Sequence, residues 1–457
     1  MSNPDLVLVL RYRKAVTYGH HVLLAALEEH PTSTRYEVVF AESEKATVAA
    51  IQAAAKSAKT LVLWSFYSPD AAALAEELQR IKAAAPGAVH VAGGVHATAE
   101  PVRTLDAGWD IAAVGEGEST LLNLVDQGGD PTGIQGLVYR DEQGTLHRTG
   151  KAQREPLGRY RAFPLTYKRM NPIEITRGCV YACRFCQTPF MFSAKFRHRS
   201  VENVRWHVDR MRELGKRDVR FITPTSLSYG ADDEEPNLAA VEELLASCKE
   251  GIGPGGRVFF GSFPSEIRPE HMSVAALKVV KRYCANDNLI VGAQSGSERV
   301  LEAAKRGHDV ESVRRAVRIG IAEGFRINVD MIFGMPGEDP EDAAASLELA
   351  TELAGLGARI HSHVFMPLPG TPWRDAAPGD VDPETIRAVS RLAQQGALYG
   401  HWEKQRAHAR ELAAAAAERP RPGRSRTLLP LAQPDHDARQ AGEHGGGACA
   451  NGGVAAR

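Results

Sequence analysis

Short apolar runs alternate with amphipathic stretches along residues 1–125. The amphipathic stretches are rich in Ala and Leu and keep their charges on one face, which is typical of surface helices that cover a parallel sheet. This alternation predicts an α/β domain with a Rossmann-like (flavodoxin-like) sheet. The predicted strands cover 6–10, 36–40, 61–65, 89–92 and 111–114, and the predicted helices cover 22–29, 47–57 and 71–84.

A second alternating series follows a connector over 126–168, in which turn signals flank a short hairpin at 136–140 and 145–148. Apolar runs separated by helical patterns over 169–405 predict a partial (β/α)6 TIM-like barrel, with its chemistry at the carboxyl ends of the strands. Asp339 and Pro340 mark a helix start before 343–353. The predicted strands cover 173–175, 219–223, 258–262, 289–292, 327–332 and 360–365.

Composition narrows the class of protein. Apolar residues make up 43% and charged residues 24% of the 457 residues, which is typical of a globular protein. The formal net charge is −1, so no overall field favours nucleic acid or an anionic membrane, and we expect neither as a partner. The apolar runs are strand-sized and the first residues lack a signal-peptide pattern, which predicts a cytoplasmic protein. Residues 406–457 contain an alanine run and a Gly-rich end, and we expect a flexible tail there.

Polar or glycine-rich turns follow three of the strands predicted in residues 1–125. Ligands of open α/β sheets bind outside the carboxyl ends of the strands, and glycine lets the backbone approach a bulky ligand. A cofactor site at this edge is one interpretation, and simple strand-terminating glycines are the other. The turn residues are Ser65, Tyr67, Gly93, Gly94, His96, Gly115, Glu116 and Gly117.

Three of the six cysteines, Cys179, Cys183 and Cys186, lie close together at C-x3-C-x2-C spacing. Six cysteines are too few for a disulfide scaffold in a chain of this length. Thiolates so close together in a reducing compartment are metal ligands far more often than disulfides. No fourth Cys or His at short spacing completes a zinc site, and His198 is the nearest imidazole. An iron–sulfur cluster with one open iron fits better.

This segment, in which Phe185 comes just before the last cysteine, resembles the signature of the radical S-adenosylmethionine (SAM) superfamily. The resemblance implies that the three cysteines hold a 4Fe-4S cluster, that its open iron binds SAM, and that the Phe185 backbone contacts adenine. It also implies reductive cleavage of SAM to a 5′-deoxyadenosyl radical, with an external electron donor such as flavodoxin or ferredoxin.

Three further strand ends are similar to turns that contact SAM in this superfamily. The end of the second barrel strand corresponds to the turn that holds the SAM amino group. The "QSGS" turn after the fourth strand resembles one that reaches the ribose and carboxylate, and the "GxPGE" turn after the fifth resembles one near adenine. Considered alone, each of these three turns could also be an ordinary turn that ends a strand. The SAM-binding residues that this implies are Thr223, Thr225, Gln294, Ser295, Glu298 and Gly334.

The glycine-rich turns of residues 1–125 are similar to those of cobalamin-binding (B12-binding) domains that precede many radical SAM barrels. The resemblance implies that the eight turn residues named above contact cobalamin. No Asp-x-His-x-x-Gly motif offers a lower ligand to cobalt, and many relatives without it bind cobalamin with its dimethylbenzimidazole displaced. His20, His21 and His96 are candidates for local contacts. A domain that keeps the fold and has lost the cofactor is the alternative.

His361 and His363 alternate on one face of the predicted sixth strand, so both imidazoles can point into the barrel. Substrate binding or proton transfer would suit them, and they are the candidate catalytic residues. A histidine pair hydrogen-bonded to barrel carbonyls is the other interpretation. The segment resembles one in a cobalamin-binding radical SAM group whose reaction is unassigned.

The resemblance as a whole implies a cobalamin-dependent radical SAM enzyme that methylates an unactivated carbon of a small molecule or peptide. Radical rearrangement or cyclisation without methyl transfer is an alternative. Methylthiolation of tRNA or protein is disfavoured, because residues 1–178 contain no cysteine for a second cluster and no basic RNA-binding module follows the barrel. A non-enzymatic sensor would require the SAM turns to be accidental.

Overall fold

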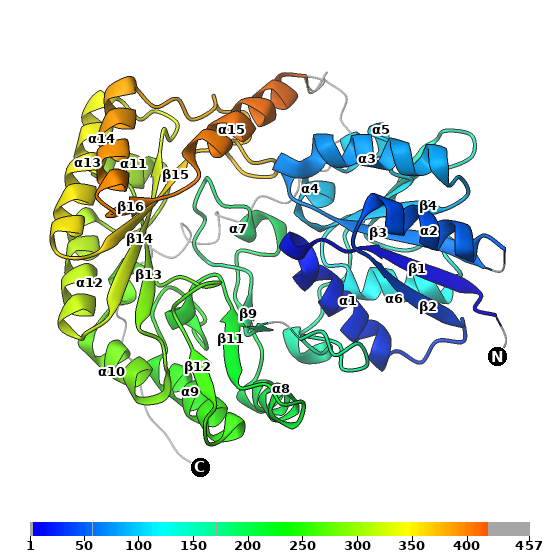
Figure 1. Cartoon of the computed structure of the whole chain (residues 1–457), viewed down its shortest axis with the longest axis horizontal. Coiled ribbons are helices and arrows are strands. Elements are labelled where there is room, and N and C mark those ends of the chain that lie inside the picture. The colour runs from blue at the N-terminus through cyan, green and yellow to red at the C-terminus, as the bar shows by residue number, and fades with distance from the viewer. Residues whose placement is uncertain (1–2, 57, 171, 419–457) are drawn as a thin grey trace, which may run out of the picture. The chain divides into compact units, whose positions relative to one another are not determined.

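The computed structural model describes residues 3–56, 58–170 and 172–418 (Figure 1). Its first part is a seven-stranded sheet in the order β2-β1-β3-β4-β5-β6-β7. The strands from β2 to β5 run parallel, and all the strands predicted for residues 1–125 are present. The strands are β1 (Leu6–Arg11), β2 (Tyr36–Ala41), β3 (Lys59–Ser65), β4 (Val89–Gly93), β5 (Ile111–Ala113), β6 (Leu137–Arg140) and β7 (Leu146–Arg148).

Helices cover both faces of this sheet, which is why β1 is buried along its whole length. Leu8 packs on one face with α1 and α6, and Val9 packs on the other with α2 and α3. Since successive side chains point to opposite faces, a doubly covered strand needs a continuous apolar run. The helices are α1 (Thr17–Glu29), α2 (Glu44–Ala54), α3 (Ala71–Ala84), α4 (Gly94–Ala99), α5 (Pro101–Asp106) and α6 (Glu118–Asp126).

The hairpin expected within the connector forms as β6 and β7, and it continues the first sheet. Strand β6 pairs antiparallel with β5, with Val138 opposite Ala112. Val138 is buried together with Leu105 of α5, so the hairpin shares the core of the first domain.

The second part contains two parallel sheets that form the broken wall of a partial barrel. Strands β12, β11 and β8 form one sheet, and β13, β14, β15 and β16 form the other. An isolated bridge between Ile267 and Val291 joins them. The six predicted strands are present. Strand β16 was not predicted, because its two residues are too few to form a recognisable pattern. The strands are β8 (Ile173–Glu174), β11 (Asp218–Ile222), β12 (Arg257–Phe259), β13 (Asn288–Gln294), β14 (Arg326–Phe333), β15 (Arg359–Val364) and β16 (Leu398–Tyr399).

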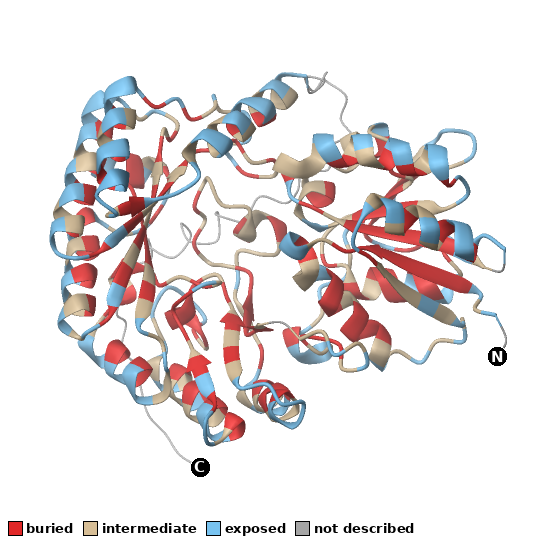
Figure 2. Ribbon diagram, in the orientation of Figure 1, coloured by how far each residue is buried: buried red, intermediate tan, exposed pale blue. Residues whose placement is uncertain are grey.

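Amphipathic helices cover the outer side of these strands, with their exposed faces outward (Figure 2). Strands and helices share one large apolar core, in which Val329 and Ile360 of the strands meet Val313 and Leu349 of the helices. The predicted helix start at Asp339 is a complete capping box with Asp342. The helices are α8 (Val201–Glu213), α9 (Leu238–Ile252), α10 (Val274–Tyr283), α11 (Glu298–Ala303), α12 (Val310–Ala322), α13 (Pro340–Gly355) and α14 (Pro383–Gln394).

The prediction of a flexible tail from residue 406 onward is wrong for its first residues. Residues up to 417 form helix α15 (Trp402–Ala417), because an alanine run favours helix and Ala409 and Leu412 are buried. Trp402 Nε1 donates to Ser362 Oγ at 2.6 Å, which ties the helix to β15. The rest of the expected tail lies outside the described residues. Within the described part of the chain, no helix combines the length and apolar character needed to cross a bilayer.

Candidate functional site

The three cysteines lie in the loop that follows β9 (Thr176–Arg177), a short strand paired with β10 (Arg197–His198). Gly178 precedes the first cysteine with a left-handed backbone, φ +82°, and a Cβ there would lie 2.2 Å from the carbonyl oxygen of Lys195. The amide of Cys179 donates to the carbonyl of Ser193 at 3.0 Å. The loop therefore packs closely on the segment before β10, and this approach requires glycine.

The thiols of the cysteine loop are free, and Cys183 is only 3% exposed. Burial and the neighbouring Cys186 raise the pKa of Cys179 to about 12, and burial and Cys183 raise the pKa of Cys186. Thiols in such surroundings ionise when a metal cation replaces the proton, so this set fits metal ligation. Three cysteines can hold three irons of a 4Fe-4S cluster and leave the fourth iron open.

Arg306 is a buried cation beside the cysteines that the sequence analysis missed. Its Nη1 atom donates to the Cys183 sulfur at 3.8 Å, and its Nη2 atom donates to the Gly292 carbonyl at 2.7 Å. Nη2 also lies 3.4 Å from Glu266 Oε1. A guanidinium here would stabilise the negative charge of thiolate ligands. No spacing marks Arg306 in the sequence, because it meets Cys183 only in the folded chain.

Phe185 lies in a small apolar cluster with Met335 and Phe365. Met335 belongs to the "GxPGE" turn after β14, so the residue before the last cysteine and this turn meet in the fold. Gly334 in the turn has φ +73°, and its N–H donates to Glu338 Oε1 at 2.9 Å. Burial raises the pKa of Glu338 to about 7. The result is an apolar wall next to the cysteine loop, of the kind that accepts a flat ring.

The ends of β11 and β13 carry unusual polar groups. Thr223 Oγ1 donates to the Thr225 carbonyl at 3.0 Å, while Thr225 Oγ1 is buried and has no hydrogen-bond partner among the residues that the structure describes. Gln294 is buried with φ +76° and follows a register shift in β13. An unpaired buried hydroxyl and a left-handed glutamine are costly, and such features concentrate at ligand sites. Thr225 and Gln294 therefore keep their predicted role in SAM binding, whereas the Thr223 hydroxyl already donates to a backbone carbonyl.

Ser295 and Glu298 make contacts that hold the barrel together. Ser295 is fully buried and its hydroxyl lies 3.2 Å from the Ser346 hydroxyl. Glu298 Oε1 accepts from the Val310 amide at 2.9 Å, at the start of α12. Contacts of these two side chains with SAM would have to share or replace these bonds.

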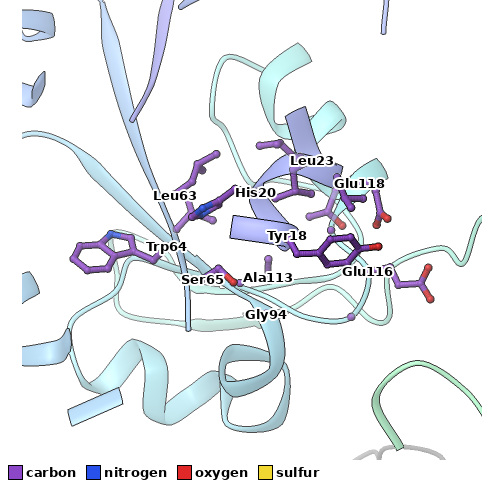
Figure 3. Close-up of a pocket in the computed structure, with 18 of the residues that line it drawn as sticks. Tyr18, His20, Leu23, Leu63, Trp64, Ser65, Gly94, Ala113, Glu116 and Glu118 are labelled. Carbon is purple, nitrogen blue, oxygen red and sulfur yellow. The ribbon is translucent and has the colours of Figure 1, made fainter. Parts of the chain in front are cut away.

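A cavity of about 200 Å³ lies at the carboxyl edge of the seven-stranded sheet (Figure 3). Tyr67 and His96, both predicted to contact cobalamin, are not in its lining. Tyr67 is 48% exposed, and His96 Nδ1 lies 3.0 Å from the Ser68 hydroxyl. The predicted residues that do line the cavity are Ser65, Gly93, Gly94, Gly115, Glu116 and Gly117.

Helices α1 and α6 close the cavity with apolar side chains, among them Leu23 and Leu121. His20 of α1 also lines it, next to Leu63 in Figure 3, and is 1% exposed. Burial and the neighbouring His21 lower the pKa of His20 to about 4, so the ring is neutral. Among the described residues, neither ring nitrogen makes a hydrogen bond of ordinary geometry, although the Leu63 backbone lies close enough to oppose the lowering of the pKa. A buried imidazole in this state offers one donor and one acceptor to a ligand.

Two glycines of the cavity lining pack closely on neighbouring side chains. Gly94 has φ +85°, and a Cβ there would lie 2.9 Å from Ser65 Oγ. A Cβ on Gly117 would lie 3.1 Å from a methyl carbon of Leu23. Glycines thus keep side chains out of this apolar slot, as close approach of a ligand would require.

A buried ion-pair network joins the cavity to the cysteine loop. Arg177 Nη1 donates to Glu116 Oε2 at 2.8 Å, and Nη2 donates to Glu118 Oε1 at 2.9 Å and to Glu174 Oε2 at 2.7 Å. Burial alone would raise the pKa of Glu118, and the Arg177 cation reverses this and lowers it. Arg197 adds a second cation on Glu116. Arg177 lies two residues before Cys179, so one side chain connects both sites.

His361 and His363 lie on β15 beside Asp330 of β14. His361 Nδ1 is 3.0 Å from Asp330 Oδ1, and the two imidazole centroids are 4.1 Å apart. The ring of Tyr399 stacks on His361 at 4.5 Å. Gln405 Nε2 lies 3.0 Å from His363 Nδ1. Burial and the neighbouring His361 lower the pKa of His363 to about 4. Asp330 and Gln405 were not predicted, since only the fold brings them to the histidines.

Two family models match separate parts of the chain. Residues 6–125 match the family model of the B12 binding domain, and residues 173–350 match that of the radical SAM superfamily. A tRNA-2-methylthio-N(6)-dimethylallyladenosine synthase of Shewanella sp. (strain W3-18-1) is 28% identical over 239 residues, which cover 50% of this chain and 48% of the relative. The chain thus spans about half the length of that curated relative.

Two solved structures share the fold. The radical SAM methyltransferase TsrM of Kitasatospora setae, with cobalamin and a 4Fe-4S cluster bound, has a TM-score of 0.64 at 19% identity, over 82% of this chain and 78% of its own. The cobalamin-dependent SAM radical enzyme OxsB, with aqua-cobalamin bound, has a TM-score of 0.59 at 16% identity, over 86% of this chain and 56% of its own.

Residues 173–350 therefore form a radical SAM domain. A B12-binding domain, residues 6–125, precedes the radical SAM domain. The fold class predicted from the sequence is confirmed.

Proposed function

We propose that the protein transfers a methyl group from SAM, by way of cobalamin, to an unactivated carbon of a small molecule or peptide. The observation that carries the proposal is the Arg177 network, which ties Glu116 and Glu118 of the cavity to the cysteine loop. A substrate between the two sites would meet both cofactors. When bound, the cluster and SAM supply hydrogen-atom abstraction and cobalamin supplies the methyl group.

The residues of the chain bind and orient these groups. Cys179, Cys183 and Cys186 hold the cluster, and Arg306 balances its negative charge. Phe185 contributes to the apolar wall that excludes water from the SAM site. The lining around His20 and Gly94 holds the flat base of cobalamin. We place SAM contacts at Thr225, Gln294 and Gly334, with weaker support for Ser295 and Glu298, whose side chains already have structural partners.

A small-molecule substrate has independent support. The TsrM fold has also been solved with tryptophan and a SAM analog bound, at a TM-score of 0.63 to this chain. The near-neutral charge of this chain adds no attraction for nucleic acid. Free buried thiols suit a reducing compartment such as the cytoplasm, where a flavodoxin or ferredoxin would be the electron donor.

Methylthiolation is the second candidate function, since the curated relative named above is a methylthio-adenosine synthase. A second cluster in the first domain would need ligands, and residues 1–178 contain no cysteine. The apolar cavity around His20 is also unexplained by that reaction. Rearrangement without methyl transfer would use the same cofactors and differs in its products.

Isotope tracing tests the proposal. The reconstituted enzyme, with cobalamin and reductant under anaerobic conditions, is incubated with SAM that carries a deuterated methyl group and with a small-molecule extract. We expect a product that contains the deuterated methyl group on carbon and no added sulfur. A product with a methylthio group, or a rearranged product without deuterium, would overturn methylation.

A further inference from the structure

We infer that Asp330, His361, His363 and Gln405 form a substrate-binding site in the barrel that offers one proton acceptor and one proton donor side by side. The acceptor is His361 Nε2 and the donor is the N–H at His363 Nε2. The inference rests on the proposed function only in taking a small molecule or peptide as the substrate.

Gln405 fixes the protonation state of His363. The Val364 amide donates to Gln405 Oε1 at 2.9 Å, so the oxygen of this side chain must face the backbone. Its Nε2 group, which can only donate, then faces His363 Nδ1 at 3.0 Å. His363 Nδ1 is therefore an acceptor, and the proton of the neutral ring is on Nε2. The lowered pKa of His363 agrees with a neutral ring.

Asp330 fixes the opposite tautomer of His361, with the proton on Nδ1. An ionised carboxylate only accepts, so His361 Nδ1 carries the proton that it donates to Asp330 Oδ1. The lone pair of the neutral ring is then at Nε2. The carboxylate also stabilises the imidazolium that forms when Nε2 takes a proton. The stacked ring of Tyr399 holds the plane of His361.

Both Nε2 atoms are free for a ligand. Within the described residues, the hydrogen bonds of the two histidines use only their Nδ1 atoms. The His361 side chain is 31% exposed. Ile360 and Val364, which alternate with the histidines on β15, are buried in the outer core. The two imidazoles therefore face the interior of the barrel.

The site lies in one row with the machinery around the cluster. Across four adjacent positions of the sheet, Gly292 pairs with Asp330, Asp330 with His361, and His361 with Tyr399. The Gly292 carbonyl accepts from Arg306, which contacts Cys183. Neighbouring strands are about 4.8 Å apart, so a small substrate can reach both His361 and the region of the cluster.

A divalent metal is the competing occupant, because the ligand atoms of Asp330, His361 and His363 lie within 4.8 Å of one another. A metal-bound histidine normally donates its other ring N–H to an acceptor. Gln405 instead presents a donor to His363 Nδ1, which leaves the proton on Nε2, where a metal would bind. The surroundings of His363 therefore favour hydrogen bonding over metal ligation.

The chemistry that fits is recognition and deprotonation of a polar group next to the reacting carbon. A carboxamide, a peptide unit or a hydroxyl has both an N–H or O–H and an acceptor lone pair. Its proton moves to His361 Nε2, the electron pair of that bond stays on the substrate, and Asp330 balances the imidazolium charge. His363 donates its Nε2 proton in a hydrogen bond and keeps it.

Histidine-selective 15N labelling of the full-length, cluster-loaded protein tests the site, since long-range proton–nitrogen correlation spectra distinguish the two tautomers. We expect the proton on Nε2 of His363 and on Nδ1 of His361. In Gln405→Ala, we expect mixed tautomers at His363 and an unchanged His361. The matched control is Gln394→Ala, an exposed glutamine of α14, in which both rings should match the wild type.

Two results would overturn the inference. One is a wild-type His363 with its proton on Nδ1. The other is stoichiometric binding of Zn²⁺ in isothermal titration that His363→Ala abolishes. SAM cleavage and cobalamin retention are recorded on the same wild-type samples. Loss of either contradicts the proposed function, whereas the tautomers report on the histidine site alone.

Discussion

Arg177 Nη1 donates to Glu116 Oε2 at 2.8 Å between residues that are 61 positions apart in the sequence. Both side chains are nearly buried, at 10% and 6% exposure. Arg177 precedes the cysteine loop, and Glu116 lines the cavity of the B12-binding domain. One buried ion pair therefore couples the two proposed cofactor sites.

Removal of this cation should destabilise the protein strongly. Arg177→Met leaves Glu116, Glu118 and Glu174 buried without their shared partner, so we expect a loss of about 3–5 kcal/mol in the free energy of unfolding. Chemical denaturation measures it. Arg35→Met, which breaks an exposed pair with Asp5, is the control and should change little. Equal stabilities of the two variants would contradict a structural role for the network.

The cysteine loop should bind iron only as a complete set. We expect Cys183→Ala to lose most of the iron and the visible absorbance of the reconstituted cluster, because one of three ligands is gone. Cys284→Ala, outside the loop, should keep both. Iron analysis and absorbance spectra check this. If Cys183→Ala kept the iron content of the wild type, the cysteine loop could not be the cluster-binding site.

The glycine-lined slot should control retention of cobalamin. In Gly94→Ala, the new methyl group would lie 2.9 Å from Ser65 Oγ within the cavity lining, so we expect about tenfold weaker cobalamin binding, on the order of 1.4 kcal/mol. Gly87 has a similar left-handed backbone and open space around it. Gly87→Ala therefore controls for backbone strain and should bind normally. Equal losses in both variants would show that strain, and not the slot, is responsible.

The buried His20 should make the stability of the cobalamin-free protein depend on pH. Its pKa is about 4 in the folded chain against an ordinary value of 6.5, so the unfolded chain binds the extra proton between these values. Stability from His20 is therefore present above pH 6.5 and is lost as the pH falls toward 4, by about 2 kcal/mol at pH 5.

Unfolding at pH 7 and pH 5 tests this estimate. His20→Leu should lose less stability than the wild type on acidification, because no proton is taken up at that position on unfolding. His401→Leu, at an exposed position, should behave like the wild type. A His20→Leu variant with the wild-type loss would contradict a buried neutral imidazole.

Local patterns in the sequence predict most of the fold. Alternation and apolar runs locate strands such as β1 and β14, and the Asp339-Pro340 cap locates α13. Strand β16 has only two residues, too few to show the alternation of a strand. Most of helix α15 was predicted as a flexible tail, because its alanine run shows no apolar stripe. Elements whose identity depends on packing alone are the ones missed.

Some residues of the candidate site have a local sequence signal, and others become recognisable only in the fold. The spacing of Cys179, Cys183 and Cys186 is a local signal, and so are the glycine-rich turns. Arg306 and Asp330 have no local signal, because their partners lie on other strands and loops. Tyr67 and His96 belong to the expected turns, yet only the fold shows that they are outside the cavity lining.

Analysis of SAM-derived products tests the central claim most directly. The reconstituted protein is incubated anaerobically with SAM and reductant, with and without cobalamin, and the products are quantified by mass spectrometry. We predict 5′-deoxyadenosine that depends on Cys183, and S-adenosylhomocysteine only when cobalamin is present. Cleavage of SAM by Cys183→Ala, or S-adenosylhomocysteine formation that is indifferent to cobalamin, would contradict the account.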